Sequence, residues 1–159
     1  MRCAYVLAVV LTVFSPGIGA SAQSTPASPR AAPARLETAV FAGGCFWSTE
    51  ANFEHMPGVV SAVSGFSGGR VADPSYEQVV RGGTGHREAV QVVFDPARIT
   101  YRQLVDRFWR TIDPTDAQGQ FCDRGASYRT AVFATAAQRP VAEASRAAAA
   151  AALPGRRFV

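Results

Sequence analysis

Strand-type and helix-type segments alternate along most of this chain, and this alternation constrains its fold more than any other feature. The expected strands cover residues 38–42, 59–66, 88–94 and 128–134, and the expected helices cover 46–55, 75–81, 100–111 and 136–152. The strands are recognised by short apolar or alternating runs, and the helices by apolar stripes at helical spacing. Each kind of element must bury an apolar face against the other. The sequence therefore predicts an α/β (α+β) domain, a two-layer sandwich of helices against a mixed sheet.

The composition limits both the size of this protein and its partners. With 159 residues and 48% hydrophobic residues, the chain can bury one core but not two. Its net charge is +4, and its 16 basic residues, all arginine, are scattered rather than clustered. Because a nucleic-acid surface needs basic residues gathered on one face, we expect no nucleic-acid partner.

The amino-terminal residues have the composition of a targeting segment. Residues 1–22 combine a positive start at Arg2, an apolar stretch over 4–14 and a small-residue cleavage motif ending at Ala22. The apolar stretch is short for the alternative, an uncleaved membrane anchor. We therefore expect export to the periplasm or the outside of the cell, with no membrane attachment after cleavage. Proline-rich residues 23–37 would form a flexible lead-in.

The first expected helix opens on a cysteine. Gly43 and Gly44 allow a tight turn from the preceding strand, and Cys45, Phe46 and Trp47 follow directly. The amino end of a helix favours a thiolate, and two aromatic rings beside it would provide an apolar wall. A lone cysteine is more often a small buried apolar residue, so the hypothesis of a nucleophile depends on the groups around it.

Four further residues are candidates for the same site. Glu88 begins an apolar strand, where partial burial would keep its carboxyl group protonated. Tyr76 and Tyr128 lie at the edges of expected elements and could direct hydroxyl groups into a cleft. Asp123 lies in the polar loop over 113–127. Taken singly, the alternatives are a solvated carboxylate, core tyrosines and a turn-forming aspartate.

Signal cleavage would remove Cys3 and leave Cys45 and Cys122. In an oxidising compartment these two could form a static disulfide, or a redox pair that opens and closes during turnover. Their spacing fits neither a zinc site nor a Cys-x-x-Cys motif, so we expect no metal.

A Cys45–His86 dyad of a cysteine hydrolase is a further alternative. It is less favoured, because the histidine of papain-like enzymes follows the cysteine by about 130 residues.

Several motifs together resemble peptide methionine sulfoxide reductase A, in unbroken order from residue 38 to residue 159. The motifs that carry the resemblance include Gly44–Trp47, Gly65–Gly69, Pro74–Tyr76, Gly85–Val90 and Asp113–Pro114. The resemblance identifies 38–159 as the enzyme domain, without the C-terminal tail usual in the family. With this resemblance we expect the two-layer sandwich to be a ferredoxin-like plait.

The resemblance also assigns roles in the reduction of methionine S-sulfoxide. Cys45 would attack the sulfoxide sulfur, and Glu88 would protonate the oxygen. The hydroxyl groups of Tyr76 and Tyr128 would bind that oxygen, and Asp123 would order substrate or water. The substrate-binding residues would be Phe46 and Trp47, which hold the terminal methyl group.

The reaction leaves a sulfenic acid on Cys45, which a second thiol must resolve. Relatives usually carry resolving cysteines in the tail, so Cys122 is the candidate here, with an external thiol as the alternative. The resemblance implies no bound cofactor, a thioredoxin-like dithiol as reductant, oxidised proteins or peptides as substrates, and a monomer. The competing interpretation is a truncated homologue that is inactive or only binds.

Overall fold

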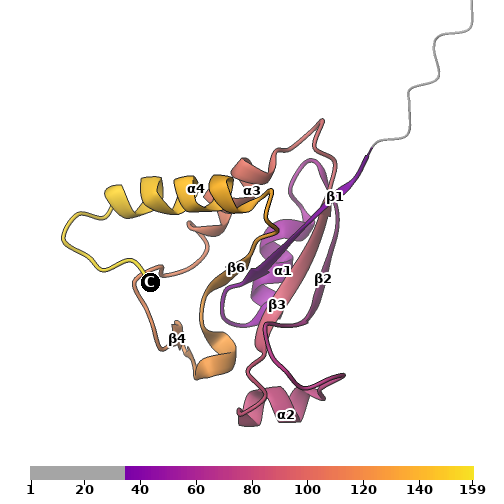
Figure 1. Cartoon of the computed structure of the whole chain (residues 1–159), viewed down its shortest axis with the longest axis vertical. Coiled ribbons are helices and arrows are strands. Elements are labelled where there is room, and N and C mark those ends of the chain that lie inside the picture. The colour runs from indigo at the N-terminus through magenta and orange to yellow at the C-terminus, as the bar shows by residue number, and fades with distance from the viewer. Residues whose placement is uncertain (1–34) are drawn as a thin grey trace, which may run out of the picture. The chain divides into compact units, whose positions relative to one another are not determined.

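The computed structural model describes residues 35–159, and a four-stranded sheet forms the centre of this part of the chain (Figure 1). Its strands lie in the order β2-β3-β1-β6. They are β1 (Glu37–Ala42), β2 (Val59–Ser67), β3 (Arg87–Phe94) and β6 (Ala131–Phe133). With helices joining β1 to β2 and β3 to β6, this is the order of a ferredoxin-like plait. The expected two-layer α/β architecture is confirmed.

Every neighbouring pair of strands in this sheet is antiparallel, so the expectation of a mixed sheet is wrong. Helix α1 (Phe46–Glu54) leads β2 back parallel to β1, as a strand–helix–strand unit does. However, β3 lies between these two strands and runs against both. The parallel strands are therefore never neighbours.

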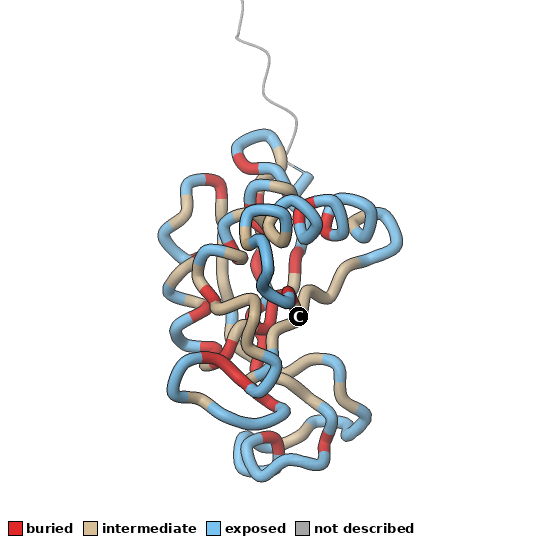
Figure 2. The backbone as a smooth tube through the Cα atoms, turned by 90° about the vertical axis from the view of Figure 1, so that its left-hand side faces the viewer, coloured by how far each residue is buried: buried red, intermediate tan, exposed pale blue. Residues whose placement is uncertain are grey.

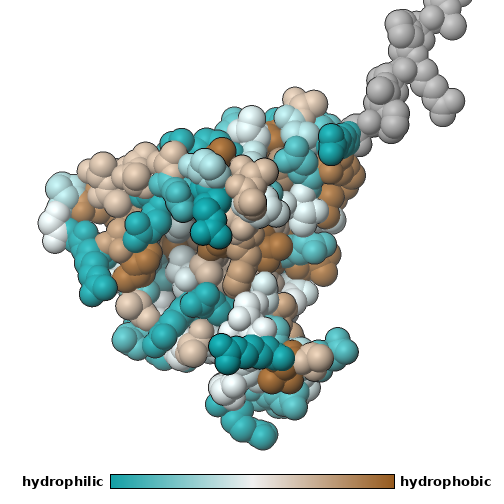
Figure 3. Space-filling model, viewed as in Figure 1, coloured by the Kyte–Doolittle hydropathy of each residue, from teal (hydrophilic) through white to brown (hydrophobic). Residues whose placement is uncertain are grey.

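The remaining helices are α2 (Tyr76–Arg81), α3 (Tyr101–Phe108) and α4 (Arg139–Ala151). Both α2 and α3 begin with a complete capping box, at Ser75 and Thr100 respectively. Alanine side chains cover much of the outer surface of α4 (Figure 3). The small buried face of α4 includes Ala142 and Ser145.

The expected strand over 128–134 is shorter than predicted. Only Ala131–Phe133 pair with β1, and Tyr128 ends a short 3₁₀ helix, η1 (Ala126–Tyr128). The preceding polar loop contains a small hairpin of β4 (Gly119–Gln120) and β5 (Asp123–Arg124). A local pattern of apolar residues could not reveal this hairpin, because its strands have two residues each.

The core lies on the helical face of the sheet, and its buried segments run through the middle of the domain (Figure 2). Phe41 is fully buried at its centre. Its ring stacks on Phe53 of α1 at 4.8 Å between centroids and lies 5.0 Å from Phe108 of α3. Phe41 therefore joins both helices to the sheet.

Residues 1–22, the expected signal peptide, lie outside the described residues, as does most of the lead-in. Strand β1 begins at Glu37, the last residue of the expected lead-in. In residues 35–159 no helix combines the length and the apolar character needed to cross a membrane.

We expect Phe41→Ala to lower the free energy of unfolding by about 3–5 kcal/mol, because it leaves a cavity between two helices and the sheet. Urea unfolding followed by circular dichroism measures this loss. Val141→Ala is the matched control, since Val141 is exposed on α4 and its truncation should change stability by no more than about 0.5 kcal/mol. Equal effects of the two substitutions would contradict the central place of Phe41.

Candidate active site

Cys45 is the N-cap of α1 and follows a turn that requires its glycines. Gly44 has φ +85°, and a side chain there would place its Cβ 2.6 Å from the Cβ of Gln120. A Cβ on Gly43 would lie 2.8 Å from the ring of Phe108. The turn is therefore confined between the core and the β4–β5 hairpin. Cys45 is partly buried and, like Cys122, is a free thiol.

Glu88 lies directly beside this turn. Glu88 is only 1% exposed, and its Oε2 accepts a hydrogen bond of 2.9 Å from the backbone N–H of Phe46. Burial raises the pKa of the Glu88 carboxyl above its ordinary value, and the negative charge of Asp123 raises it further. The Phe46 bond acts in the opposite direction without cancelling the effect of burial. Glu88 is thus a buried carboxyl group with a raised pKa, in line with the burial that the sequence analysis expected.

Tyr128 belongs to a group of two carboxyl and two phenol side chains around Glu88. Burial raises the pKa of Tyr128 to about 12, and the neighbouring Glu88, Tyr76 and Asp123 contribute in the same direction. Such effects act over short distances, so the side chains of Tyr128, Glu88, Tyr76 and Asp123 lie close together. The phenol of Tyr128 therefore remains a hydrogen-bond donor at any physiological pH.

The aromatic residues of the site have two different environments. Phe46 is buried, and its ring lies 5.7 Å from Trp47, 5.8 Å from Phe66 and 6.2 Å from Tyr76. By contrast, Trp47 is 69% exposed. Phe46 therefore forms an apolar floor close to Cys45, whereas Trp47 stands at the rim.

The β4–β5 hairpin brings the polar loop to the site. Gln120 pairs with Asp123, which leaves Phe121 and Cys122 as the two-residue turn between them. Cys122 is exposed there. The structure thus brings Cys45, Glu88 and both tyrosines together with Asp123, and places Cys122 one residue from that group.

Gln120 is a site residue that sequence analysis missed. It is 1% exposed, and its Oε1 accepts a 2.7 Å hydrogen bond from the N–H of Asp113. Its Nε2 donates to the Asp113 carbonyl at 2.9 Å and to Thr130 Oγ1 at 3.0 Å. The fully bonded amide thereby holds the hairpin against Gly44. No local signal distinguishes this glutamine from a solvated loop residue.

His86 holds a loop instead of forming a catalytic dyad. Its Nδ1 accepts a 3.2 Å hydrogen bond from the N–H of Gly69, and its Nε2 lies 2.9 Å from the carbonyl oxygen of Val71. Because the carbonyl needs a donor, Nε2 carries the proton. Both ring nitrogens are engaged by backbone, so the Cys45–His86 interpretation is wrong.

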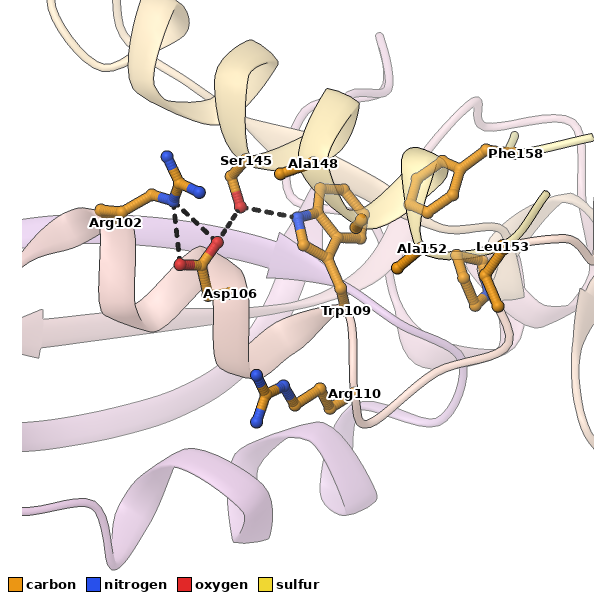
Figure 4. A pocket seen from close by; sticks show the side chains of 11 residues that line it. Arg102, Asp106, Trp109, Arg110, Ser145, Ala148, Ala152, Leu153 and Phe158 are labelled. Atoms are coloured by element: carbon orange, nitrogen blue, oxygen red, sulfur yellow. Dashed lines mark hydrogen bonds and ion pairs between the residues drawn. The ribbon is translucent and has the colours of Figure 1, made fainter.

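A separate hollow lies between α3 and α4 (Figure 4). The indole N–H of Trp109 donates to Ser145 Oγ at 3.0 Å, Ser145 in turn bonds Asp106, and Arg102 pairs with Asp106 at 2.8 Å. The polar groups are thus bonded to one another. None of the expected site residues lines this hollow. Within residues 35–159, no three His, Cys, Asp or Glu side chains lie together as a metal site would require.

We expect Glu88→Gln to stabilise the protein at neutral pH. Because the pKa of Glu88 is higher in the folded than in the unfolded chain, ionisation above about pH 4.3, the ordinary value for glutamate, reduces wild-type stability. Glutamine cannot ionise and retains an oxygen for the Phe46 N–H. The difference in free energy of unfolding, measured by urea unfolding from pH 4 to pH 8, should rise with pH in favour of the variant. A difference that is constant with pH would contradict the raised pKa.

Comparisons with known proteins agree on one family. A family model described as peptide methionine sulfoxide reductase matches residues 37–155. Peptide methionine sulfoxide reductase MsrA 2 of Caulobacter vibrioides is 54% identical over 123 residues, which are 77% of this chain and 63% of that protein. MsrA of Ligilactobacillus salivarius is 54% identical over 113 residues, 70% of this chain and 66% of its own.

Solved structures give the same result. Methionine sulfoxide reductase A of Corynebacterium diphtheriae is 34% identical with a TM-score of 0.69, and the match covers 80% of this chain and 63% of that one. Reduced Mxr1 from Saccharomyces cerevisiae is 33% identical with a TM-score of 0.64, covering 72% and 68%. The chain spans less than two thirds of the length of the Caulobacter vibrioides and Ligilactobacillus salivarius relatives.

Proposed function

Because the chain belongs to the peptide methionine sulfoxide reductase family, we propose that it reduces the S epimer of methionine sulfoxide in oxidised proteins or peptides. The observation that carries this proposal is the hydrogen bond between Glu88 and the backbone N–H of Phe46. It holds a buried acid, whose pKa is raised, next to the residue that bears the candidate nucleophile. Such a pair suits attack by sulfur coupled to protonation of oxygen.

The reaction follows from the chemistry of these groups. The Cys45 thiolate attacks the electrophilic sulfur of the sulfoxide, while Glu88 protonates the sulfoxide oxygen. Tyr76 and Tyr128 donate hydrogen bonds to that oxygen, and the rings of Phe46 and Trp47 hold the substrate methyl group. In net terms one oxygen atom passes from the substrate to Cys45. The sulfoxide gains two electrons and becomes methionine, and the cysteine loses two electrons and becomes a sulfenic acid.

Cys122 is our candidate for resolving that intermediate. A thiol condenses with a sulfenic acid to give a disulfide and water, and an external dithiol of the thioredoxin type would then reduce the disulfide. Two observations support the candidate: Cys122 is exposed, and it adjoins Asp123, which acts on Glu88. Oxidised polypeptides and this reductant are the partners we propose. No bound cofactor takes part, and export would follow from residues 1–22.

The central experiment offers racemic methyl p-tolyl sulfoxide and dithiothreitol to the purified protein and follows both epimers by chiral chromatography. We expect loss of the S epimer alone. Cys45→Ser should abolish it, and Glu88→Gln should reduce kcat by about 10²–10⁴-fold, the usual contribution of a general acid. Circular dichroism checks that each variant is folded. A folded wild-type protein that leaves both epimers intact would support the inactive homologue instead.

The resolving role of Cys122 has its own test. After one turnover without reductant, mass spectrometry of the wild-type protein should show a disulfide between Cys45 and Cys122. In Cys122→Ser the sulfenic acid on Cys45 should persist and react with dimedone. Turnover with dithiothreitol should continue in this variant, because a small dithiol can reach the sulfenic acid directly. A dimedone adduct of equal yield in both proteins would show that Cys122 is a bystander.

A further inference from the structure

Three aromatic side chains of residues 35–159 are strongly exposed, and all three belong to segments that contribute to the candidate active site. They are Trp47, which is 69% exposed, Phe121, which is 64% exposed, and Tyr76, which is 45% exposed. The other large exposed apolar residues are aliphatic. Exposed aromatic residues are typical of binding surfaces, where they contribute large contact areas. The proposed function uses Trp47 and Tyr76 but leaves Phe121 without a role.

Phe121 has an unfavourable backbone conformation as well as an exposed ring. It is the first residue of the two-residue turn between β4 and β5, and its φ is +52°. Glycine is preferred where such a turn needs a positive φ, because a side chain is strained there. The exposed ring gains little from folding, so neither feature contributes to stability. A strained, exposed aromatic residue at a site indicates a function outside the fold.

The structure places this turn at the rim of the candidate active site. On one side of Phe121, Gln120 abuts Gly44, which precedes Cys45. On the other side, Asp123 acts on the buried carboxyl group of Glu88. Phe121 therefore lies in a turn whose two flanking residues contact or act on the immediate surroundings of the nucleophile and of the acid. Trp47 of α1 and Tyr76 of α2 lie on the other side of the site, where both rings neighbour Phe46.

We propose that Phe121 determines specificity by contacting apolar residues that flank methionine sulfoxide in a polypeptide. This inference rests on the proposed function. Phe46 and Trp47 suffice for the substrate methyl group, so an aromatic ring on a separate hairpin is free to contact the neighbouring residues. Methionine is usually buried among apolar residues, and its oxidation disrupts such cores. A damaged protein would therefore present its sulfoxide beside exposed apolar side chains.

The test compares three substrates with dithiothreitol as reductant. They are an acetylated pentapeptide with leucines on both sides of methionine sulfoxide, the same peptide with glycines in place of leucines, and methyl p-tolyl sulfoxide. For Phe121→Gly we expect kcat/KM on the leucine peptide to fall about tenfold through KM, because the ring no longer covers apolar surface. The other two substrates should change less than twofold. Phe121→Leu should keep most of the wild-type preference.

Two controls separate this role from a structural one. Phe121→Gly relieves the positive φ, so its melting temperature should equal or exceed that of the wild type. Val60→Thr alters an apolar residue on β2 that is 57% exposed, and it should leave the ratio between the two peptides unchanged.

Three results would overturn the inference. The first is an equal loss of kcat/KM on all three substrates in Phe121→Gly, and the second is no loss on the leucine peptide. The third is a loss of kcat/KM only when thioredoxin replaces dithiothreitol, which would assign Phe121 to binding of the reductant. In each case an active wild-type protein leaves the proposed function standing. A folded wild-type protein that cannot reduce methyl p-tolyl sulfoxide would overturn the proposed function, and this inference with it.

Discussion

The hydrogen bond from the Phe46 N–H to Glu88 is the interaction on which the rest of the site depends. It joins the first residue of α1 to the second residue of β3, 42 positions apart in the sequence. The position of the acid relative to Cys45 is therefore set by the packing of a helix on a sheet. The same burial that excludes water from Glu88 also raises the pKa of its carboxyl group.

Several features of this site reduce stability in ways that the core must offset. Glu88 is a buried carboxyl group with a raised pKa, and Phe121 is exposed with a positive φ. Phe41 and the aromatic residues around it supply the opposing contribution, because they bury large apolar surfaces against two helices. Unfavourable groups that lie together at one end of a well-packed sheet are typical of a functional site.

The polar loop before β6 reaches the site through one buried side chain. Gln120 bonds Asp113 and Thr130 at the two ends of this loop and packs on Gly44, so it joins the loop to the distant turn before Cys45. The hairpin held in this way supplies Asp123, Cys122 and Phe121. This half of the site thus depends on a buried, fully bonded amide.

Local patterns in the sequence predicted most elements and most of the candidate site residues. Apolar patterns, alanine content and start signals predicted all four helices and the three long strands, and motifs singled out Cys45, Glu88 and both tyrosines as candidates. Only the tertiary structure decided that all neighbouring strands are antiparallel, because that depends on β3 lying between β1 and β2. It likewise decided the roles of Gln120 and His86, since the backbone groups that they bond, at Asp113 and Gly69, come within reach only in the folded chain. Sequence specifies which residues favour a helix, a strand or a reactive group, whereas contacts between distant segments exist only after the chain has folded.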